Sequence, residues 1–155
     1  MKLFIIADDF TGALDTGVKF AAAGISTKVV TDFSLDFLED QKQEDVVVVV
    51  EMRKRISENL GGIADFWIRQ DCTLMIIGGD TVQGFAVKAH LRQIIPIEEI
   101  ATGSVLSQII TDKKRLYLIS KSGGFGEETL LEEIAEKITK GVGIGREEES
   151  NEHKG

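Results

Sequence analysis

Short apolar runs alternate with amphipathic stretches along this chain, and that order predicts an α/β fold. Apolar runs predict strands at residues 2–7, 27–30, 45–50, 73–77 and 116–119. The run 45–50 contains five consecutive valines, which is typical of a strand covered on both faces within a parallel sheet. We therefore expect three layers, in which a mostly parallel sheet lies between helices.

Apolar residues at helical spacing predict the helices that connect these strands. One helix follows the first strand, and another follows the fourth strand through about Gln93, before a break at Pro96. Residues 127–139 form the clearest amphipathic helix, with acidic residues in its first turn. Residues 51–70 look helical on both sides of Gly61-Gly62, and because glycine disfavours helix interiors we interpret this stretch as a junction.

The composition is that of an ordinary globular protein. Of 155 residues, 43% are hydrophobic and 28% are charged, which disfavours general disorder. No apolar run approaches the roughly 18–20 residues that span a bilayer, and the apolar N-terminal run is too short for a signal peptide. The single cysteine, Cys72, cannot form an internal disulfide, so we expect a cytoplasmic protein with no membrane partner.

The charge balance disfavours a nucleic-acid partner. The formal net charge is −8, from 26 acidic and 18 basic residues, whereas a nucleic-acid-binding protein needs a basic face. Residues 127–155 contain 9 acidic and 4 basic residues and so carry −5 of this charge. We expect the end of this segment, residues 141–155, to be a disordered tail, and its charge says little about a binding pocket.

Three polar motifs each lie where a predicted strand ends and a helix begins. In open α/β sheets this edge binds ligands, because helix N-termini and unpaired N–H groups face it. The first motif supplies Asp8, Asp9, Thr11, Gly12 and Asp15. Carboxylates can accept hydrogen bonds from sugar hydroxyls or deprotonate one of them. The simpler interpretation is that Asp9 or Thr11 only caps the helix.

The second and third motifs are rich in glycine. Gly78-Gly79-Asp80-Thr81 would let a phosphate approach the backbone, with Asp80 placed to position a metal-bound nucleotide. A tight turn with Asp80 or Thr81 as a helix cap also explains this motif, which lacks the Gly-Lys-Ser/Thr ending of a Walker A loop. Residues 121–126 offer a lysine, a serine and three glycines, which would suit nucleotide phosphates or form a tight turn.

Other features favour structural roles. The glycines in residues 141–145 imitate a dinucleotide fingerprint but follow a helix instead of a strand, which disfavours an NAD-dependent fragment. Cys72 is expected in the core and not as a nucleophile, and Phe66 and Trp67 are expected to pack. His90 has no acidic or cysteine partner at ligand spacing, and no metal cluster is predicted.

The three motifs, read together, resemble one known family. Residues 6–17 closely resemble the N-terminal signature of the four-carbon acid sugar kinase family, where it opens the substrate-binding domain. Residues 78–81 and 120–126 resemble two loops of that family's C-terminal nucleotide-binding domain, in the same order. The resemblance implies ATP-dependent phosphorylation of a small sugar acid of the tetronate or 3-oxo-tetronate type, with ATP and Mg²⁺ as cofactors.

The resemblance also implies roles for single residues. It assigns substrate binding to Asp8, Asp9, Thr11, Gly12 and Asp15. It assigns nucleotide binding to Gly78, Gly79, Asp80, Thr81, Gly123 and Gly124. Three of these, Asp8, Asp9 and Asp80, are candidates for the general base. Acids beside glycine-rich loops suit phosphoryl transfer, which depends on positioning and charge neutralisation more than on covalent chemistry.

The chain is less than half as long as members of that family. We interpret residues 1–52 as the N-terminal part of the substrate-binding domain and residues 58–140 as the C-terminal part of the nucleotide-binding domain, separated by an internal deletion. The sequence leaves open whether both parts join one sheet. The alternative function is a catalytically inactive remnant that binds nucleotide, a sugar acid or a partner chain. A homodimer is expected if the deletion exposes the valine strand.

Overall fold

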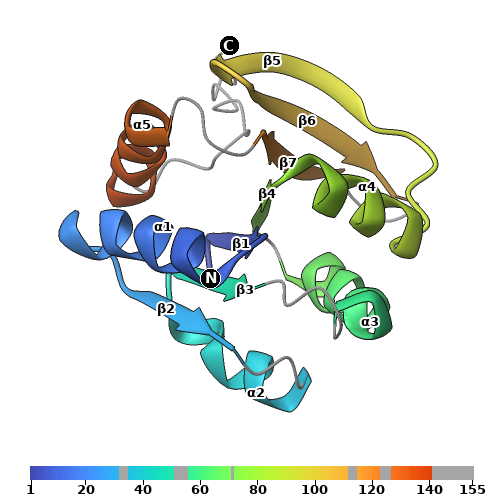
Figure 1. Cartoon of the computed structure of the whole chain (residues 1–155), viewed down its shortest axis with the longest axis horizontal. Helices are drawn as coiled ribbons and strands as arrows, with labels where there is room; N and C mark the ends of the chain where they lie inside the picture. The colour runs from blue at the N-terminus through green and yellow to red at the C-terminus, as the bar shows by residue number, and fades with distance from the viewer. Residues whose placement is uncertain (32–34, 51–55, 71, 112–114, 123–126, 141–155) are drawn as a thin grey trace, which may run out of the picture.

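The computed structural model describes residues 1–31, 35–50, 56–70, 72–111, 115–122 and 127–140 (Figure 1). Its strands are β1 (Leu3–Ala7), β2 (Thr27–Val30), β3 (Val46–Val50), β4 (Thr73–Ile77), β5 (Ile95–Ala101), β6 (Ser104–Ile110) and β7 (Arg115–Lys121). Its helices are α1 (Phe10–Ala22), α2 (Leu35–Asp40), α3 (Ile56–Arg69), α4 (Gly79–Lys88) and α5 (Glu127–Thr139), with a 3-10 turn at Gln41–Gln43. The predicted disordered tail, residues 141–155, lies outside the described residues.

The strands form one seven-stranded sheet in the order β2-β3-β1-β4-β7-β6-β5. Neighbours from β2 to β7 in this order are parallel, and β6 and β5 extend the sheet as antiparallel strands. Leu3 of β1 lies opposite Val46 of β3 on one side and Thr73 of β4 on the other. The prediction of an α/β fold with a mostly parallel sheet is therefore confirmed.

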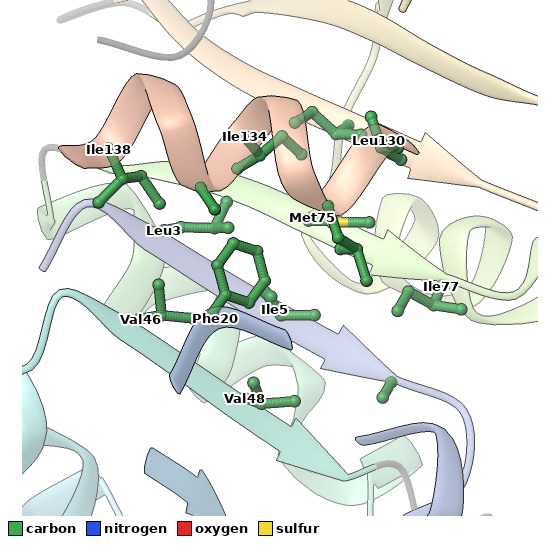
Figure 2. Packing of buried hydrophobic residues seen from close by; sticks show 14 of the residues in the cluster. Leu3, Ile5, Phe20, Val46, Val48, Met75, Ile77, Leu130, Ile134 and Ile138 are labelled. Atoms are coloured by element: carbon green, nitrogen blue, oxygen red, sulfur yellow. The ribbon is translucent and has the colours of Figure 1, made fainter. Parts of the chain in front are cut away.

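Helices cover both faces of the sheet, which makes the three expected layers. Helices α1 and α5 lie on one face, and α3 and α4 lie on the other (Figure 1). The valines of β3 divide between the faces: Val47 and Val49 join the cluster that contains residues of α3 and α4. Val46, Val48 and Val50 join the cluster that contains residues of α1 and α5 (Figure 2). All five valines are at most 1% exposed, so this strand offers no apolar surface to a second copy.

Aromatic side chains of α3 fill the second face of the sheet. Phe66 and Trp67 are fully buried, with ring centroids 5.6 Å from Phe4 and 5.7 Å from Phe85 of α4, respectively. The indole N–H of Trp67 donates a hydrogen bond to the carbonyl oxygen of Cys72 at 3.2 Å, and the cysteine itself is buried. The predicted packing roles of Phe66, Trp67 and Cys72 are confirmed.

Helix α3 is continuous through Gly61-Gly62, where the sequence pattern indicated an interruption. Two helical glycines cost about 1 kcal/mol each relative to alanine, and burial of the apolar face of α3 outweighs this. The helix connects β3 to β4, the two strands that flank β1. Strands from residues 1–52 and from residues 58–140 thus pair within a single sheet, which answers the question that the sequence left open.

The sequence analysis did not predict helix α2 or strands β5 and β6. It also predicted one helix that is longer than the one observed. Helix α4 ends at Lys88 and not near Gln93. The hydrophobic pattern does not indicate strand β5, because this edge strand has two register shifts and exposed acidic residues at Glu98 and Glu99. It also contains Pro96, which we expected to mark a break. A proline is tolerated in an edge strand, because the outer side of that strand forms no hydrogen bonds with a neighbouring strand.

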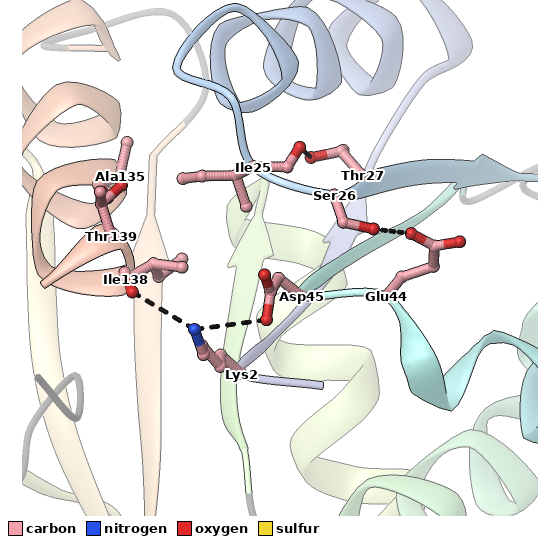
Figure 3. A network of polar contacts seen from close by, with 9 residues as sticks. All are labelled: Lys2, Ile25, Ser26, Thr27, Glu44, Asp45, Ala135, Ile138 and Thr139. Atoms are coloured by element: carbon pink, nitrogen blue, oxygen red, sulfur yellow. Dashed lines mark hydrogen bonds and ion pairs between the residues drawn. The ribbon is translucent and has the colours of Figure 1, made fainter. Parts of the chain in front are cut away.

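Polar contacts join the elements at the amino ends of the strands (Figure 3). The ammonium of Lys2, just before β1, lies 3.3 Å from a carboxylate oxygen of Asp45 and donates to the carbonyl oxygen of Ile138, also at 3.3 Å. The hydroxyl of Ser26 donates to Glu44. These contacts connect α5 and β3 to β1 at the edge of the sheet opposite the three motifs.

We expect close packing between α1 and β2 to make Gly17 sensitive to substitution. A Cβ atom placed on Gly17 would lie 2.8 Å from Cγ2 of Val29, a branched side chain that cannot rotate away freely. Gly17→Ala should lower the free energy of unfolding by about 1–3 kcal/mol in urea denaturation followed by circular dichroism.

The double variant provides the control for this prediction. In a Val29→Ala background the contact is relieved, and Gly17→Ala should instead stabilise by about 1 kcal/mol through helix propensity. Equal effects of Gly17→Ala in both backgrounds would contradict the close contact.

Candidate functional site

The first two motifs lie side by side at one edge of the sheet, with the start of the third next to them. Strands β1, β4 and β7 are neighbours and run parallel, so their carboxyl ends meet at the same edge. Asp8 follows β1, Gly78 follows β4, and Lys121 ends β7. Residues separated by more than a hundred positions in the chain are thereby gathered where α/β sheets bind ligands.

Asp9 caps helix α1. Its backbone is extended, with φ −147° and ψ 165°, and its Oδ1 accepts a hydrogen bond from the N–H of Gly12 at 2.6 Å. The capping interpretation of the first motif therefore holds for Asp9, and the hydrogen bond occupies one of its carboxylate oxygens. Asp8 and Thr11 are exposed. Asp15 is also exposed but lies inside the helix, roughly 7 Å further along its axis than the first helical residue.

Asp8 contacts the glycine loop of the second motif. Gly78 has φ +103°, a conformation that L side chains rarely adopt, and a Cβ atom on it would lie 3.0 Å from Oδ2 of Asp8. A glycine is thus required here both by the backbone and by the close approach of the carboxylate. The acid motif and the first glycine-rich motif are in direct contact.

The remaining residues of the second motif form the first turn of α4. Gly78 is the N-cap, so neither Asp80 nor Thr81 has the capping position that the simpler interpretation assigned to them. Asp80 is exposed and Thr81 is buried. A Cβ atom on Gly79 would meet nothing within 4 Å, so the space beside this part of the backbone is open. This helix N-terminus is open to an anion from the carboxyl edge.

The third motif is linked to the second through its backbone. The N–H of Gly78 donates a hydrogen bond to the carbonyl oxygen of Lys121 at 2.9 Å. The lysine side chain is 2% exposed, and its ammonium donates to the carbonyl oxygen of Ser122 at 3.3 Å. Gly123 and Gly124, which the sequence assigned to the nucleotide, lie outside the described residues.

A fourth loop joins this edge, and the sequence interpretation missed it. Because β6 is antiparallel to β7, the turn between β5 and β6 lies beside the carboxyl end of β7. The N–H and the hydroxyl of Ser122 both donate to the carbonyl oxygen of Gly103, at 3.0 and 3.2 Å. Gly103 has φ +72°, and Thr102-Gly103 between two apolar runs was the available sequence signal for a hairpin turn.

The carboxyl ends of these strands bring together carboxylate oxygens and the N-terminus of α4. Exposed carboxylates of Asp8 and Asp80 lie next to the open backbone at Gly79. Within the described ranges, no group of three or more His, Cys, Asp or Glu side chains could hold a metal ion by itself. None of the helices described is both long and apolar enough to cross a bilayer. The open N-terminus of α4 suits an anionic group of a ligand, and the two carboxylates suit its hydroxyl groups or a cation bound with it.

Comparison with known families gives a match over most of the chain. The family model described as the nucleotide-binding C-terminal domain matches residues 16–131. The match begins within α1 and ends within α5, so it includes β2 and β3 from the segment that we assigned to the substrate-binding domain. No curated protein matches the sequence.

Several solved structures share the fold. A domain of unknown function (DUF1537) from Bordetella bronchiseptica, a domain-swapped dimer with bound citrate, has a TM-score of 0.66 at 16% identity over 88% of this chain. The putative tRNA synthase from Salmonella typhimurium has a TM-score of 0.64 at 13% identity over 86% of the chain. A DUF1537 protein of Haemophilus influenzae has a TM-score of 0.61 at 14% identity over 89% of the chain. The chain spans only 39–40% of the length of these proteins.

We expect Asp9 to act in folding as the cap of α1. Asp9→Ala should lower the free energy of unfolding by about 1 kcal/mol, because the N–H of Gly12 loses its acceptor. Asp9→Asn retains an acceptor oxygen and should unfold close to the wild type in the same urea titration. Asp15→Ala, at an exposed position inside the helix, serves as the matched control. An Asp9→Ala protein as stable as the control variant would argue against the cap.

Proposed function

We propose that this chain, which belongs to the family of nucleotide-binding C-terminal domains, binds ATP and transfers its terminal phosphoryl group to a hydroxyl of a four-carbon sugar acid. The nucleotide would lie against Gly78, Gly79, Asp80, Thr81, Gly123 and Gly124. The sugar acid would lie against Asp8, Asp9, Thr11, Gly12 and Asp15. The family match supports nucleotide binding, and the resemblance of the first motif to the sugar-kinase signature supports the substrate class.

The contact between Asp8 and Gly78 is the observation that carries this proposal. Phosphoryl transfer needs the accepting hydroxyl and the nucleotide phosphates to be held close together, and most of its catalysis comes from that positioning. Here a carboxylate of the sugar-side motif lies against the loop that opens the nucleotide-side helix. The two ligands would therefore meet above neighbouring strands, β1 and β4.

Of the three candidate general bases, Asp8 fits the role best. Asp9 already uses one carboxylate oxygen to cap α1, and Asp80 lies in the first turn of the helix that would receive the phosphates. Asp8 is exposed and free to accept a proton from a sugar hydroxyl.

Asp80 is suited to hold Mg²⁺ together with the phosphates. Mg²⁺ prefers oxygen ligands and usually takes only one or two protein carboxylates when phosphates supply the others. The metal would neutralise phosphate charge. The exposed carboxylate of Asp80 at the N-terminus of α4 matches that donor chemistry.

A second candidate function is binding without catalysis, as a truncated remnant that holds a nucleotide, a sugar acid or a partner chain. It is favoured by length, because the chain spans 39% of the Bordetella bronchiseptica protein of the same fold.

For both candidate functions, we propose that residues 1–52 form the substrate-binding part of the chain and residues 58–140 form the nucleotide-binding part. We also keep the cytoplasm as the proposed location, since the single cysteine, Cys72, is buried and is not part of a disulfide.

We expect the purified chain with Mg²⁺ and ATP to release ADP when a D-erythronate-like acid is present. Asp8→Asn should lower kcat by about 10²–10⁴-fold, the usual contribution of a general base. Asp45→Asn, which removes a carboxylate at the opposite edge of the sheet, should leave turnover unchanged. A coupled assay for ADP at high enzyme concentration measures both.

Titration calorimetry separates the two functions. Binding of ATP without turnover of any four-carbon acid would favour the non-catalytic function. The absence of binding to both ATP and sugar acid would remove both.

We further propose a homodimer, for which α1 offers an apolar surface in place of the valine strand. Phe10, Leu14 and Val18 are spaced by four residues along α1 and are 46–57% exposed. The related Bordetella bronchiseptica structure is a domain-swapped dimer. Light scattering after size exclusion should give twice the chain mass, and Leu14→Lys should shift it toward the monomer. A wild-type monomer at high concentration would contradict the dimer.

A further inference from the structure

The turn between β5 and β6 is held closely against the end of β7. The carbonyl oxygen of Gly103 accepts hydrogen bonds from both the N–H and the hydroxyl of Ser122, at 3.0 and 3.2 Å. Gly103 has φ +72°, and a Cβ atom placed on it would lie 2.5 Å from Oγ of Ser122. The turn therefore approaches Ser122 as closely as a glycine allows.

The side chain of Glu99 fixes the other side of Gly103. Its Oε1 accepts a hydrogen bond from the N–H of Gly103 at 3.0 Å. Glu99 pairs with Val105 and Ala101 pairs with Ser104, so β5 has one residue more than β6 over this stretch. Bulges of this kind redirect side chains and are common beside functional sites. The carboxylate of Glu99 spans the bulge and binds the turn.

A single peptide group connects this turn to the N-terminus of α4. The peptide between Lys121 and Ser122 donates its N–H to the carbonyl oxygen of Gly103. Its own carbonyl oxygen accepts a hydrogen bond from the N–H of Gly78 at 2.9 Å. Because a peptide group is planar, these two hydrogen bonds cannot be reoriented separately. A change at the turn is therefore transmitted to Gly78, the N-cap of α4 and the residue that Asp8 contacts.

The charge of Glu99 and its hydrogen bond would affect an anionic ligand in opposite directions. An exposed carboxylate at the edge proposed to hold ATP repels the phosphates, so its charge alone weakens their binding. As an acceptor it suits the turn, because a hydrogen bond to an ionised carboxylate is stronger than one to a neutral oxygen. The two effects have opposite signs, so an experiment can separate them.

We propose that Glu99 is a positioning residue of the nucleotide site. It orients Gly103, and through the peptide group before Ser122 it fixes Gly78 and the first turn of α4, where ATP would bind. This inference rests on the nucleotide binding proposed above and adds to it a residue of the β5–β6 hairpin, which none of the three motifs contains.

The test measures the affinity of the full chain for Mg²⁺-ATP by titration calorimetry. Glu99→Ala should weaken ATP binding by about 3- to 10-fold, as expected for the loss of one hydrogen bond that orders the site. Glu99→Gln keeps an acceptor oxygen and should bind ATP within about twofold of the wild type. Affinity for D-erythronate should stay unchanged in both variants, because Asp8 follows β1, and β4 separates β1 from β7.

Two further variants separate the hydrogen bond from the charge. Glu99→Asp keeps the charge on a side chain that is one methylene shorter, so it should lose ATP affinity as Glu99→Ala does. Glu98→Ala is the matched control, because it removes the neighbouring exposed carboxylate of the same strand and makes the same change in net charge. It should not weaken ATP binding. If Glu99 acted only through its charge, Glu99→Ala and Glu99→Gln would both bind ATP more tightly.

Hydrogen exchange followed by NMR tests the same contacts without any ligand. In free Glu99→Ala, the amides of Gly103, Ser122 and Gly78 should exchange faster than in the wild type, because the turn opens more readily. The amides of β1 and β3 should exchange as they do in the wild type, which excludes a general loss of stability. Glu99→Asp gives the same comparison if Glu99→Ala does not fold.

Four outcomes would overturn the inference. They are unchanged ATP affinity in both Glu99→Ala and Glu99→Asp, a loss in Glu99→Gln as large as that in Glu99→Ala, the same loss in Glu98→Ala, and equal losses of ATP and D-erythronate affinity. Absence of ATP binding by the wild type would overturn the proposed function together with this inference. Normal ATP binding by the Glu99 variants would overturn the role of Glu99 alone.

Discussion

The parallel pairing of β1 with β3 on one side and β4 on the other is the constraint on which the rest of the structure depends. It places the end of β1 beside the end of β4, and so brings Asp8 against Gly78 although the two are far apart in the sequence. Gly78 in turn bonds to Lys121 at the end of β7, and Ser122 bonds to the hairpin turn at Gly103. A continuous line of contacts across the carboxyl edge thus follows from the position of one strand.

Much of the parallel core could be predicted because each of its strands carries its own signal. The valine run predicted β3 as a strand covered on both faces, and the helical spacing of Leu130, Ile134 and Ile138 predicted α5. The β5–β6 hairpin could not be predicted in the same way, because Glu98, Glu99 and Pro96 lie in a strand with one open edge and no alternation. For helix α3 the local signal was misleading. The low helix propensity of Gly61-Gly62 indicated a break, but burial of Phe66 and Trp67 against the sheet stabilises a continuous helix.

The candidate site was predictable as a set of motifs but not as a geometry. Sequence order places Asp8, Gly78 and Lys121 at strand ends, yet only the strand order of the sheet makes them neighbours. The sequence left open whether Asp9 caps α1, and the hydrogen bond from the N–H of Gly12 shows that it does. The position of Ser104 opposite Lys121 has no sequence signature at all, since it comes from the pairing of β6 with β7. Long-range pairing of this kind is invisible to any reading of local pattern.

The central place of the first strand also determines when the protein can fold during synthesis. β1 leaves the ribosome before the other strands of this sheet, and β3 can pair with one of its edges, but the strand that covers the other edge begins only at Thr73. Until then a strand whose side chains are all fully buried in the finished protein presents an unpaired apolar edge, which is a template for aggregation. In the folded sheet, the outermost strand at one side is β5, whose proline, exposed acids and register shifts discourage further pairing. The same irregularity that hides β5 from pattern recognition therefore protects the completed sheet from joining another.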